Sequence, residues 1–258
     1  MSSEHEAVIQ VLSSIDEIDA EDWNRNANPD PAIYKPFVSH AFLKALEDAG
    51  AVRAENGWEP QHLILMAASG EVGGCMPLYA KSHSKGEYVF DYGWADAYES
   101  AGGAYYPKLL SAVPFTPVPR PRLLVHDGPD RDERMGLLAT GAAELVRRHG
   151  CSSLHVNFLS EGEWNALGRL GFLKRTDQQF HWRNDGYATF EDFLASRASR
   201  KRKTIRKERR EALANGLEIE WVTGSDIAEH HWDAMYAFYM DTGSRKWGRQ
   251  YLNRRFFS

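Results

Sequence analysis

The chain has 258 residues, of which 43% are hydrophobic and 12% aromatic, and its formal net charge at pH 7 is −5. This composition supports a buried core and argues against a disordered chain, and the length allows one large domain or two ordinary ones. The stretch MSSEHEAVIQVL lacks the basic and apolar regions of a signal peptide, and no apolar run reaches the roughly 18 residues of a membrane span. Because the two cysteines suggest no disulfide framework, we expect a cytoplasmic protein.

The pattern of the first 125 residues predicts strands and helices, with a stiff proline-rich stretch near its end. Residues 105–124 hold five prolines among apolar side chains. Since proline fixes φ and has no N–H donor, we expect an extended wall there rather than a helix or a central strand. In chain order the pattern predicts a strand over 7–15, a short acidic helix ending near Trp23, a helix from Ser39 to Gly50, a hairpin within 58–82, a strand over 86–94, a helix or turn over 94–102 and a short strand at 122–125.

The rest of the chain continues the alternation, which predicts a mixed α/β (α+β) fold. The expected elements are a helix over 131–150, a strand over 152–159, a helix over 160–171, a strand over 178–184, one basic helix over 190–215, a strand over 217–222 and a helix capped by Ser225. We expect a first domain over 1–185. Residues 186–258 offer too little for a core of their own, so we interpret them as the start of a second, C-terminally truncated domain.

The charge is distributed unevenly along the chain. Residues 197–210, RASRKRKTIRKERR, contain nine basic residues and one acid, a local balance of +8 that leaves −13 for the remainder. A basic helix on an acidic body suggests a partner or substrate with phosphate or carboxylate groups. The alternative is a solvated helix that pairs with the acidic part of its own chain.

Several well-defined cofactor motifs are absent from the sequence. It has no GxxxxGK[ST], no GxGxxG after a strand, no HExxH, no CxxC and no GxSxG. The ten histidines do not cluster at metal-ligand spacing. We therefore expect neither a metal site nor a tightly bound cofactor.

A dense aromatic and acidic segment, GEYVFDYGWADAYESAGGAYYPKLL, is the main candidate for chemistry. A carboxylate can orient or deprotonate an amine, and a lysine can bind an anionic group or a developing oxyanion. We accordingly predict catalytic roles for Asp91, Asp96 and Lys108, and substrate contacts for Tyr92, Trp94 and Tyr106. The alternative is a half-buried strand with outward polar residues.

Two further strands carry polar side chains among apolar ones. The stretch SSLHVNFL contains His155 and Asn157, and QQFHW contains Gln179 and His181. If the two strands are neighbours, these four side chains converge at a cleft and bind substrate. The alternative is that each is a hydrogen-bonded core residue.

Long motifs in a fixed order identify a family resemblance. The stretches PKLLSAVPFTPVPRPRLL, SSLHVNFLSEGEWNALGRLGFLKRTDQQFHW, FEDFLASRASRKRKTIRKERREALANGLEIEW and DTGSRKWGRQYLNRRFF resemble the FemAB-like group of the GNAT superfamily, from about residue 37 onward. That group is described in bacteria as peptidoglycan biosynthesis or recognition proteins. The resemblance implies two GNAT-like domains that share a cleft, the second beginning near the basic helix.

The resemblance also implies a reaction and its partners. Fem ligases transfer an amino acid from aminoacyl-tRNA to a peptidoglycan precursor, and ordinary GNAT enzymes use acyl-CoA, so either could be the co-substrate. The proline-rich segment would form one wall of the acceptor cleft. Donor or precursor phosphates would meet the basic helix at Arg200, Lys201, Arg202, Arg206 and Arg209.

The expected function is therefore an acyl- or aminoacyltransferase that forms an amide on a small or peptidoglycan-precursor amine. Two alternatives remain open from the sequence. One is a non-catalytic binding module for a cell-wall precursor or RNA, and the other is a fragment without activity.

Overall fold

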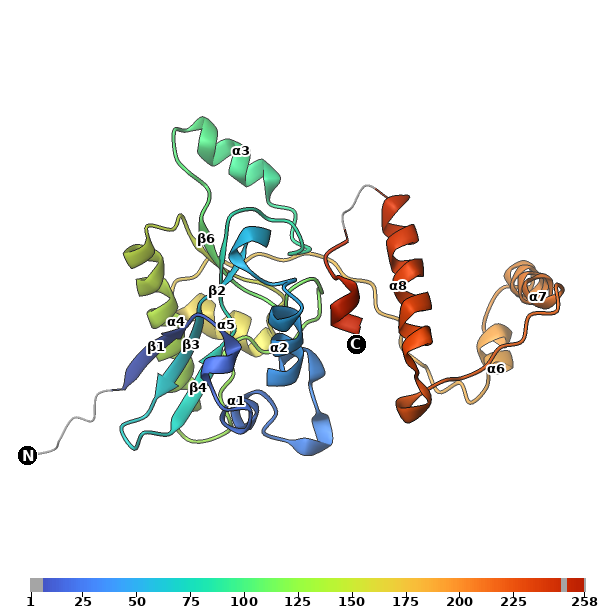
Figure 1. Ribbon diagram of the computed structural model, residues 1–258, viewed down its shortest axis with the longest axis horizontal. Coiled ribbons are helices and arrows are strands. Elements are labelled where there is room, and N and C mark those ends of the chain that lie inside the picture. The colour runs from blue at the N-terminus through green and yellow to red at the C-terminus, as the bar shows by residue number, and fades with distance from the viewer. Residues whose placement is uncertain (1–6, 247–249, 258) are drawn as a thin grey trace, which may run out of the picture. The chain divides into compact units, whose positions relative to one another are not determined.

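The computed structural model describes residues 7–246 and 250–257 (Figure 1). Within these residues it contains eight α-helices and two β-sheets, which confirms the mixed α/β class. The chain divides into a first unit, made of residues up to Lys174 together with those from Trp232 onward, and a second unit, Arg175–His231. The domain ranges predicted above also include residues 1–6, 247–249 and 258, which lie outside the described residues.

The first unit contains both sheets. Strands β1 (Val8–Leu12), β3 (His62–Met66) and β4 (Val72–Met76) form an antiparallel sheet in the order β1-β3-β4. Strands β2 (Trp58–Pro60), β5 (Tyr79–Lys81), β6 (Lys108–Ser111) and β7 (Leu154–Val156) form the other sheet in the order β2-β5-β6-β7. Strands β6 and β7 are parallel, so they require a crossover connection, which α4 (Arg131–His149) supplies.

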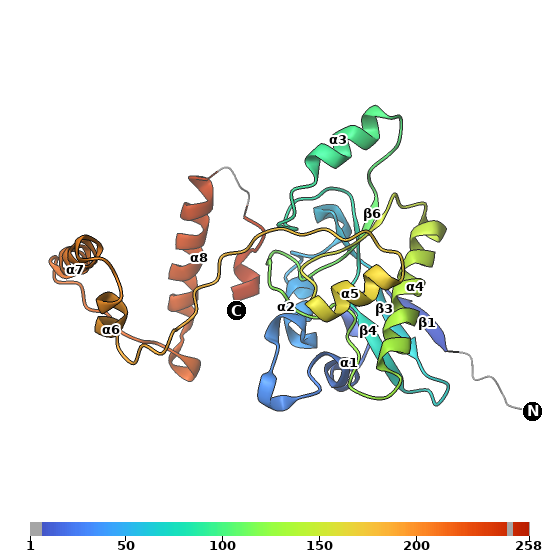
Figure 2. The ribbon, with the colours of Figure 1, turned by 180° about the vertical axis from the view of Figure 1, so that it is seen from behind.

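Helices cover both faces of the β1-β3-β4 sheet. Helices α1 (Ala20–Ala27) and α2 (His40–Asp48) lie on one face, and α4 and α5 (Glu161–Arg169) lie on the other (Figures 1 and 2). The alternation along β3 explains the two layers, because successive side chains of a strand point to opposite faces. Leu63 and Leu65 share a buried cluster with Leu138 of α4. Ile64 shares another with residues of α1 and α2.

Local capping explains where three predicted helices begin or end. The Ser39 hydroxyl accepts the Phe42 N–H at the start of α2, and α4 ends at Gly150, whose φ of 63° is left-handed. At the start of α5, Ser160 and Glu163 form a reciprocal capping box. These ends confirm the helices predicted from residues 39, 131 and 160.

The strand predicted over 86–94 is wrong. Gly86 and Tyr88 have φ values of 80° and 57°, which turn the chain, and α3 (Tyr92–Ser100) follows. The turns bring the Glu87 and Asp91 carboxylates onto the buried amine of Lys108, an arrangement that a continuous strand could not make. The strand predicted at 122–125 is reduced to a single bridge between Leu124 and Cys75.

The C-terminal residues of the first unit pack on its core. Helix α8 spans Glu229–Ser244, so it starts after the predicted cap Ser225, which lies in a separate 3-10 turn. Leu252 and Phe256 pack against a buried cluster that contains Trp58 and Tyr79. The aromatic side chains of YLNRRFF thus find cover within the first unit.

The second unit is helical, and its described residues form no strand. The basic helix predicted over 190–215 is two helices, α6 (Phe190–Ala195) and α7 (Ser199–Leu213). The Ser196 hydroxyl donates to the Phe193 carbonyl at the end of α6, which competes with helix continuation. The strands predicted at 178–184 and 217–222 are wrong, because no partner strand pairs with them among the described residues.

Candidate functional site

A cluster of buried charges lies where β5 meets β6. The register of the two strands places Lys81 directly opposite Lys108, and both side chains are fully buried. Two like charges at opposed positions destabilise a sheet unless opposite charges compensate them. The connection between the strands supplies that compensation with Ser84, Glu87 and Asp91, which are also buried. We call these five residues the polar cluster.

Lys108 is the centre of the polar cluster. Its Nζ donates to Asp91 Oδ2 at 2.6 Å, to Glu87 Oε2 at 2.9 Å and to Ser84 Oγ at 2.8 Å. The hydroxyl of Tyr105 donates to the same Asp91 oxygen at 2.8 Å. All three donors of the ammonium are used, as a buried ion pair requires to offset its desolvation. The structure thus brings together two of the predicted catalytic residues, Asp91 and Lys108.

Lys81 occupies a less polar environment. Its Nζ donates to the Gly57 carbonyl at 2.8 Å and lies 3.6 Å from the centre of the Trp58 ring. The nearest carboxylate oxygen, Glu87 Oε1, is 3.9 Å away, too far for a hydrogen bond. Burial lowers the pKa of Lys81 to about 7, against the opposing charge of Glu87. Near neutral pH this amine is therefore divided between its charged and neutral forms.

The two carboxylates retain unused acceptors. Glu87 Oε1 and Asp91 Oδ1 are buried and accept no hydrogen bond from the described residues. Burial raises the pKa of Glu87. Burial also acts to raise the pKa of Asp91, but hydrogen bonds from Lys108, Ser84 and Tyr105 outweigh it and lower the pKa. A ligand with two N–H donors would satisfy both oxygens.

The backbone around the polar cluster is strained. Tyr88 and Phe115 are not glycines, yet their φ values are 57° and 62°. Gly86 lies against Phe115, since an added Cβ there would stand 2.7 Å from the Phe115 ring. Such outliers concentrate at functional sites, so they favour a functional interpretation of this loop.

The other residues predicted in the aromatic segment differ in their placement. The Tyr106 hydroxyl shares a hydrogen bond with Ser84 at 2.8 Å, so it touches the polar cluster. Tyr92 and Trp94 lie on α3 and are about half exposed, at 54% each. Asp96 is exposed on the same helix, and within the described residues no hydrogen bond or ion pair joins it to the polar cluster.

The sequence predicted that four polar residues on two neighbouring strands would converge. The second stretch, residues 178–184, is not a strand, so strand pairing does not bring them together. His155 lies on β7, where its Nε2 is 3.0 Å from Ser153 Oγ and its ring is 6.2 Å from that of Tyr105. Asn157 is buried after β7, and its Nδ2 has no acceptor among the described residues. Gln179 and His181 belong to the second unit, where they are exposed and hydrogen-bonded to each other.

The basic helix α7 has two chemically different sides. Arg206 pairs with Glu191, Arg209 stacks on Phe190 at 4.3 Å, and Arg202 donates to the Arg197 carbonyl at 2.7 Å. These three predicted phosphate ligands therefore serve contacts within the second unit.

The adjoining side of α7 carries a row of cations at helical spacing. Arg200, Lys203, Lys207 and Arg210 follow one another at i, i+3, i+7 and i+10, which places them on one face. We call these four residues the α7 stripe. Lys201, also a predicted phosphate ligand, is exposed beside the stripe.

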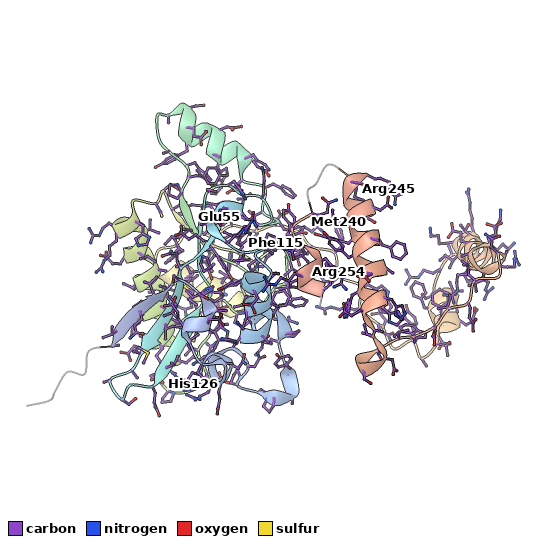
Figure 3. The ribbon with its side chains drawn as sticks, in the orientation of Figure 1. Glu55, Phe115, His126, Met240, Arg245 and Arg254 are labelled. Atoms are coloured by element: carbon purple, nitrogen blue, oxygen red, sulfur yellow. The ribbon has the colours of Figure 1, made fainter. Side chains whose placement is uncertain are left out.

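The proline-rich segment is fixed by a buried arginine. The Arg122 guanidinium donates to the carbonyls of Val118 at 2.9 Å and Arg120 at 2.8 Å. The Glu163 carboxylate accepts the N–H groups of Arg122 and Leu123 at 2.7 and 2.8 Å. The segment reaches the polar cluster through Phe115, labelled in Figure 3, whose N–H donates to the Gly86 carbonyl.

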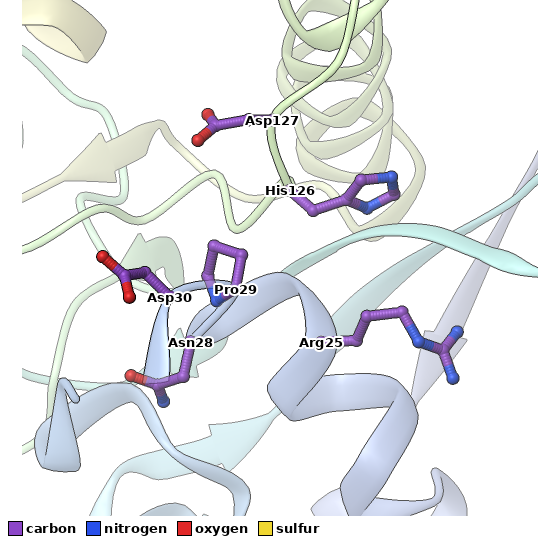
Figure 4. A pocket seen from close by; sticks show the side chains of 6 residues that line it. All are labelled: Arg25, Asn28, Pro29, Asp30, His126 and Asp127. Atoms are coloured by element: carbon purple, nitrogen blue, oxygen red, sulfur yellow. The ribbon is translucent and has the colours of Figure 1, made fainter. Parts of the chain in front are cut away.

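A shallow cavity of about 430 Å³ lies elsewhere in the first unit, lined by Arg25, Asn28, Pro29, Asp30, His126 and Asp127 (Figure 4). Its polar side chains are already engaged: Arg25 with Asp22, and His126 with Asn26. Within the described residues, no group of three or more potential metal ligands is suitably placed. The polar cluster is therefore the better candidate site.

Sequence reasoning missed Lys81, Ser84 and Glu87. Lys81 ends an otherwise apolar strand, and Glu87 interrupts the apolar run GEYVF; both are unusual places for a charge. Their convergence depends on the β5–β6 register, which the sequence does not encode locally.

A family profile described as peptidoglycan biosynthesis/recognition, FemAB-like, matches residues 14–258. Because this match covers nearly the whole chain, the protein belongs to the FemAB-like family, and membership implies a peptidoglycan-related transferase or recognition role. Comparisons with curated proteins and with solved structures gave no match. Among residues 7–246 and 250–257, no helix has the length and apolar character to cross a bilayer.

Proposed function

We propose that the chain is an acyl- or aminoacyltransferase that forms an amide on an amine acceptor of the peptidoglycan-precursor type. The observation that carries the proposal is the pair of buried carboxylate oxygens, Glu87 Oε1 and Asp91 Oδ1, that lack donors among the described residues. An acceptor amine offers two or more N–H groups to such oxygens. Lys81, with a pKa of about 7, can take up a proton near neutral pH.

In the proposed reaction the amine nitrogen attacks the carbonyl carbon of an ester or thioester donor. A C–N bond forms, and the C–O or C–S bond of the tetrahedral intermediate then breaks. The acceptor, bound as an ammonium, first gives one proton to neutral Lys81. The attacking amine then loses a second proton and the leaving oxygen or sulfur gains one, so the reaction releases the one proton that Lys81 has taken up. Asp91 orients the amine, Lys81 relays the proton, and Lys108 holds both carboxylates in place.

The proposal assigns no catalytic contact to Asp96. This carboxylate is exposed on α3, whereas Asp91 is buried against Lys108. Tyr92, Trp94 and Tyr106 are proposed to contact the acceptor, since aromatic faces bind apolar stretches of sugar and peptide without demanding a charge. His155 and Asn157 are proposed as further contacts from β7. Gln179 and His181, which are hydrogen-bonded to each other in the second unit, are proposed to bind substrate there.

The topology of the first unit supports a GNAT-like interpretation. The parallel pair β6–β7, joined by the crossover helix α4, is flanked by antiparallel strands. We propose that this unit is the first GNAT-like domain and that another begins near α7.

The donor is proposed to be acyl-CoA or aminoacyl-tRNA, both of which carry phosphates. The α7 stripe and Lys201 offer cations to those phosphates without disturbing the contacts between α6 and α7. A recognition role is the second candidate function, favoured by the complete burial of the polar cluster.

A transfer assay tests the proposal. The chain is incubated with a peptidoglycan-precursor peptide that has a free amine, and with acetyl-CoA or aminoacyl-tRNA, and the acceptor is weighed by mass spectrometry. We expect an acyl or aminoacyl mass increment, reduced about 100-fold or more in Asp91→Asn. Glu99→Gln, an exposed carboxylate on α3, is the matched control and retains the rate. Acceptor binding without a mass increment from either donor would instead favour the recognition role.

A further inference from the structure

The polar cluster is enclosed, so a ligand can reach it only if part of the wall moves. Lys81, Asp91 and Lys108 have no exposed surface. The loop 82–91 joins β5 to α3 without regular structure. It contains both buried residues, such as Glu87, and exposed ones, such as Tyr88. Since this loop supplies both carboxylates and also meets solvent, it is the wall whose movement would open the site.

Two aromatic residues of the first unit, Trp58 and Phe115, donate hydrogen bonds to backbone carbonyls of the loop. Trp58 Nε1 donates to the Lys85 carbonyl at 3.2 Å. The Phe115 N–H donates to the Gly86 carbonyl at 3.2 Å, and the Phe115 ring fills the space that a Gly86 side chain would need. Phe115 itself has a positive φ, so its ring stays against Gly86 only while neighbouring contacts keep it there.

The Phe115 ring meets the Trp58 ring edge-on with centres 5.2 Å apart, and its other ring contact comes from the C-terminal segment Gln250–Phe257. The Tyr251 ring stacks on Phe115 with centres 5.0 Å apart and planes inclined by 10°. Tyr251 is held in turn by α8, because the Tyr239 hydroxyl accepts its N–H at 2.8 Å. Asn253 Nδ2 donates to the Ala49 carbonyl at 2.5 Å, which anchors the segment to α2.

The electrostatic surroundings agree with this placement. Burial raises the pKa of Tyr251, against a hydrogen bond from the Gly86 backbone that lowers it. Burial likewise raises the pKa of Tyr88, with smaller contributions from Tyr251 and Tyr239. The Tyr251 hydroxyl thus lies close to both Gly86 and Tyr88 of the loop.

We infer that Tyr251 is a positioning residue: by stacking on Phe115 it holds the loop 82–91 closed over the polar cluster, and its release admits a ligand. This inference rests on the proposed function in treating the polar cluster as the site. It adds that a residue more than 140 positions beyond Lys108 controls access to it.

Chemical labelling of Lys81 measures the opening directly. A small acylating reagent, the N-hydroxysuccinimide ester of acetic acid, reacts with the neutral form of an amine, and it reaches the buried Lys81 amine only while the loop is open. We expect slow acetylation in the wild type and an increase of about tenfold in Tyr251→Ala, the factor that an aromatic pair of this kind supports. Peptide mass spectrometry gives the rate at Lys81, and exposed Lys203 of α7 serves as the internal reference.

Three variants separate positioning from general destabilisation. Tyr251→Phe keeps the stack and loses only the hydroxyl, so it should label much more slowly than Tyr251→Ala. Tyr34→Ala removes an exposed tyrosine away from the loop and should change nothing. Amide exchange of the β3 residues Leu63 and Leu65 should stay unchanged in Tyr251→Ala. If that exchange rises, Tyr251→Leu replaces the alanine variant, because it keeps an apolar side chain but loses the stack. Lys81 labelling and β3 amide exchange are then measured in Tyr251→Leu.

The inference is overturned if Lys81 labels at the wild-type rate in Tyr251→Ala or Tyr251→Leu with β3 exchange intact. It is also overturned if Tyr251→Phe labels as fast as the alanine variant. Labelling does not depend on transfer. Faster labelling in Tyr251→Ala without any transfer by the wild type would support this inference and contradict the proposed function. Transfer by the wild type with unchanged labelling in Tyr251→Ala would support the proposed function and contradict this inference.

Discussion

The polar cluster of the first unit and the α7 stripe of the second differ in how their charges are surrounded. In the polar cluster every charge is buried and faces an opposite charge within 4 Å. In the α7 stripe four cations share one exposed helix face. Burial makes a charge depend on its partners, and exposure leaves it available to an external anion.

The difference explains what each group can do. Buried amines and carboxylates can have shifted pKa values, as Lys81 does, and shifted groups suit proton transfer. Exposed cations keep their charge and attract phosphates over a distance set by ionic strength. Chemistry is therefore expected at the polar cluster, and partner binding at α7.

Removing the central ammonium is the most severe test of the buried group. Lys108→Met leaves Glu87 and Asp91 without their main donor in a site closed to water. We expect the free energy of unfolding to fall by about 3–5 kcal/mol, as for other broken buried ion pairs. Urea denaturation checks this, and wild-type stability in the variant would show that the cluster is hydrated rather than dry.

The pH dependence of stability tests the environment of Lys81. Its folded pKa of about 7 lies below the ordinary value of 10.5, so between these pH values the unfolded chain binds the proton that the folded chain has lost. Stability therefore gains from this group as pH rises above 7, by up to about 2 kcal/mol at pH 9.

The matched comparison for this prediction is Lys81→Met. The difference in unfolding free energy between wild type and variant should increase from pH 7 to pH 9. A difference that stays constant over this range would mean that Lys81 is charged in the folded protein throughout.

The α7 stripe is tested by two triple variants with the same change in charge. Arg200→Gln/Lys203→Gln/Arg210→Gln removes outward cations, and Arg202→Gln/Arg206→Gln/Arg209→Gln removes those that contact α6 or its end. We expect the outward variant to weaken tRNA binding more and to flatten its salt dependence by about one unit of slope per lost phosphate contact. Equal losses in the two variants would indicate a general charge effect.

An exposed ion pair of the first unit should show the smallest effect. Glu144 accepts hydrogen bonds from Arg147 and Arg148 on α4, which hold its pKa at about 2. Because the group is exposed and screened by salt, Glu144→Gln should leave the unfolding midpoint nearly unchanged. A large loss of stability here would remove the distinction between buried and exposed charges drawn above.

Helices were predictable where a cap marked their ends. Ser39, Gly150 and Ser160 each carry a local signal that needs no tertiary partner, and all three mark ends found in the structure. The single basic helix was wrong because a three-residue break at 196–198 has no proline or glycine to reveal it.

Strands were harder to predict, because a strand exists only with a partner. The alternating run LEIEWV has the period of a strand, yet Trp221 is 90% exposed and unpaired in any ladder of the described residues. The same limit applied to the site. Asp91 and Lys108 stand out in an aromatic segment, whereas Lys81 and Glu87 join them through the β5–β6 register and the turn at Gly86.

Titration of Lys81 with and without the acceptor tests whether the polar cluster is the acceptor site. Nuclear magnetic resonance of lysine labelled at Cε, with the signal assigned through Lys81→Met, reports its titration midpoint with and without a precursor peptide amine. An acceptor ammonium beside Glu87 and Asp91 places a like charge near Lys81, so we predict a midpoint below the unliganded value of about 7, with Lys44 unaffected. Saturating acceptor binding with an unchanged Lys81 midpoint would contradict the account and place the acceptor elsewhere.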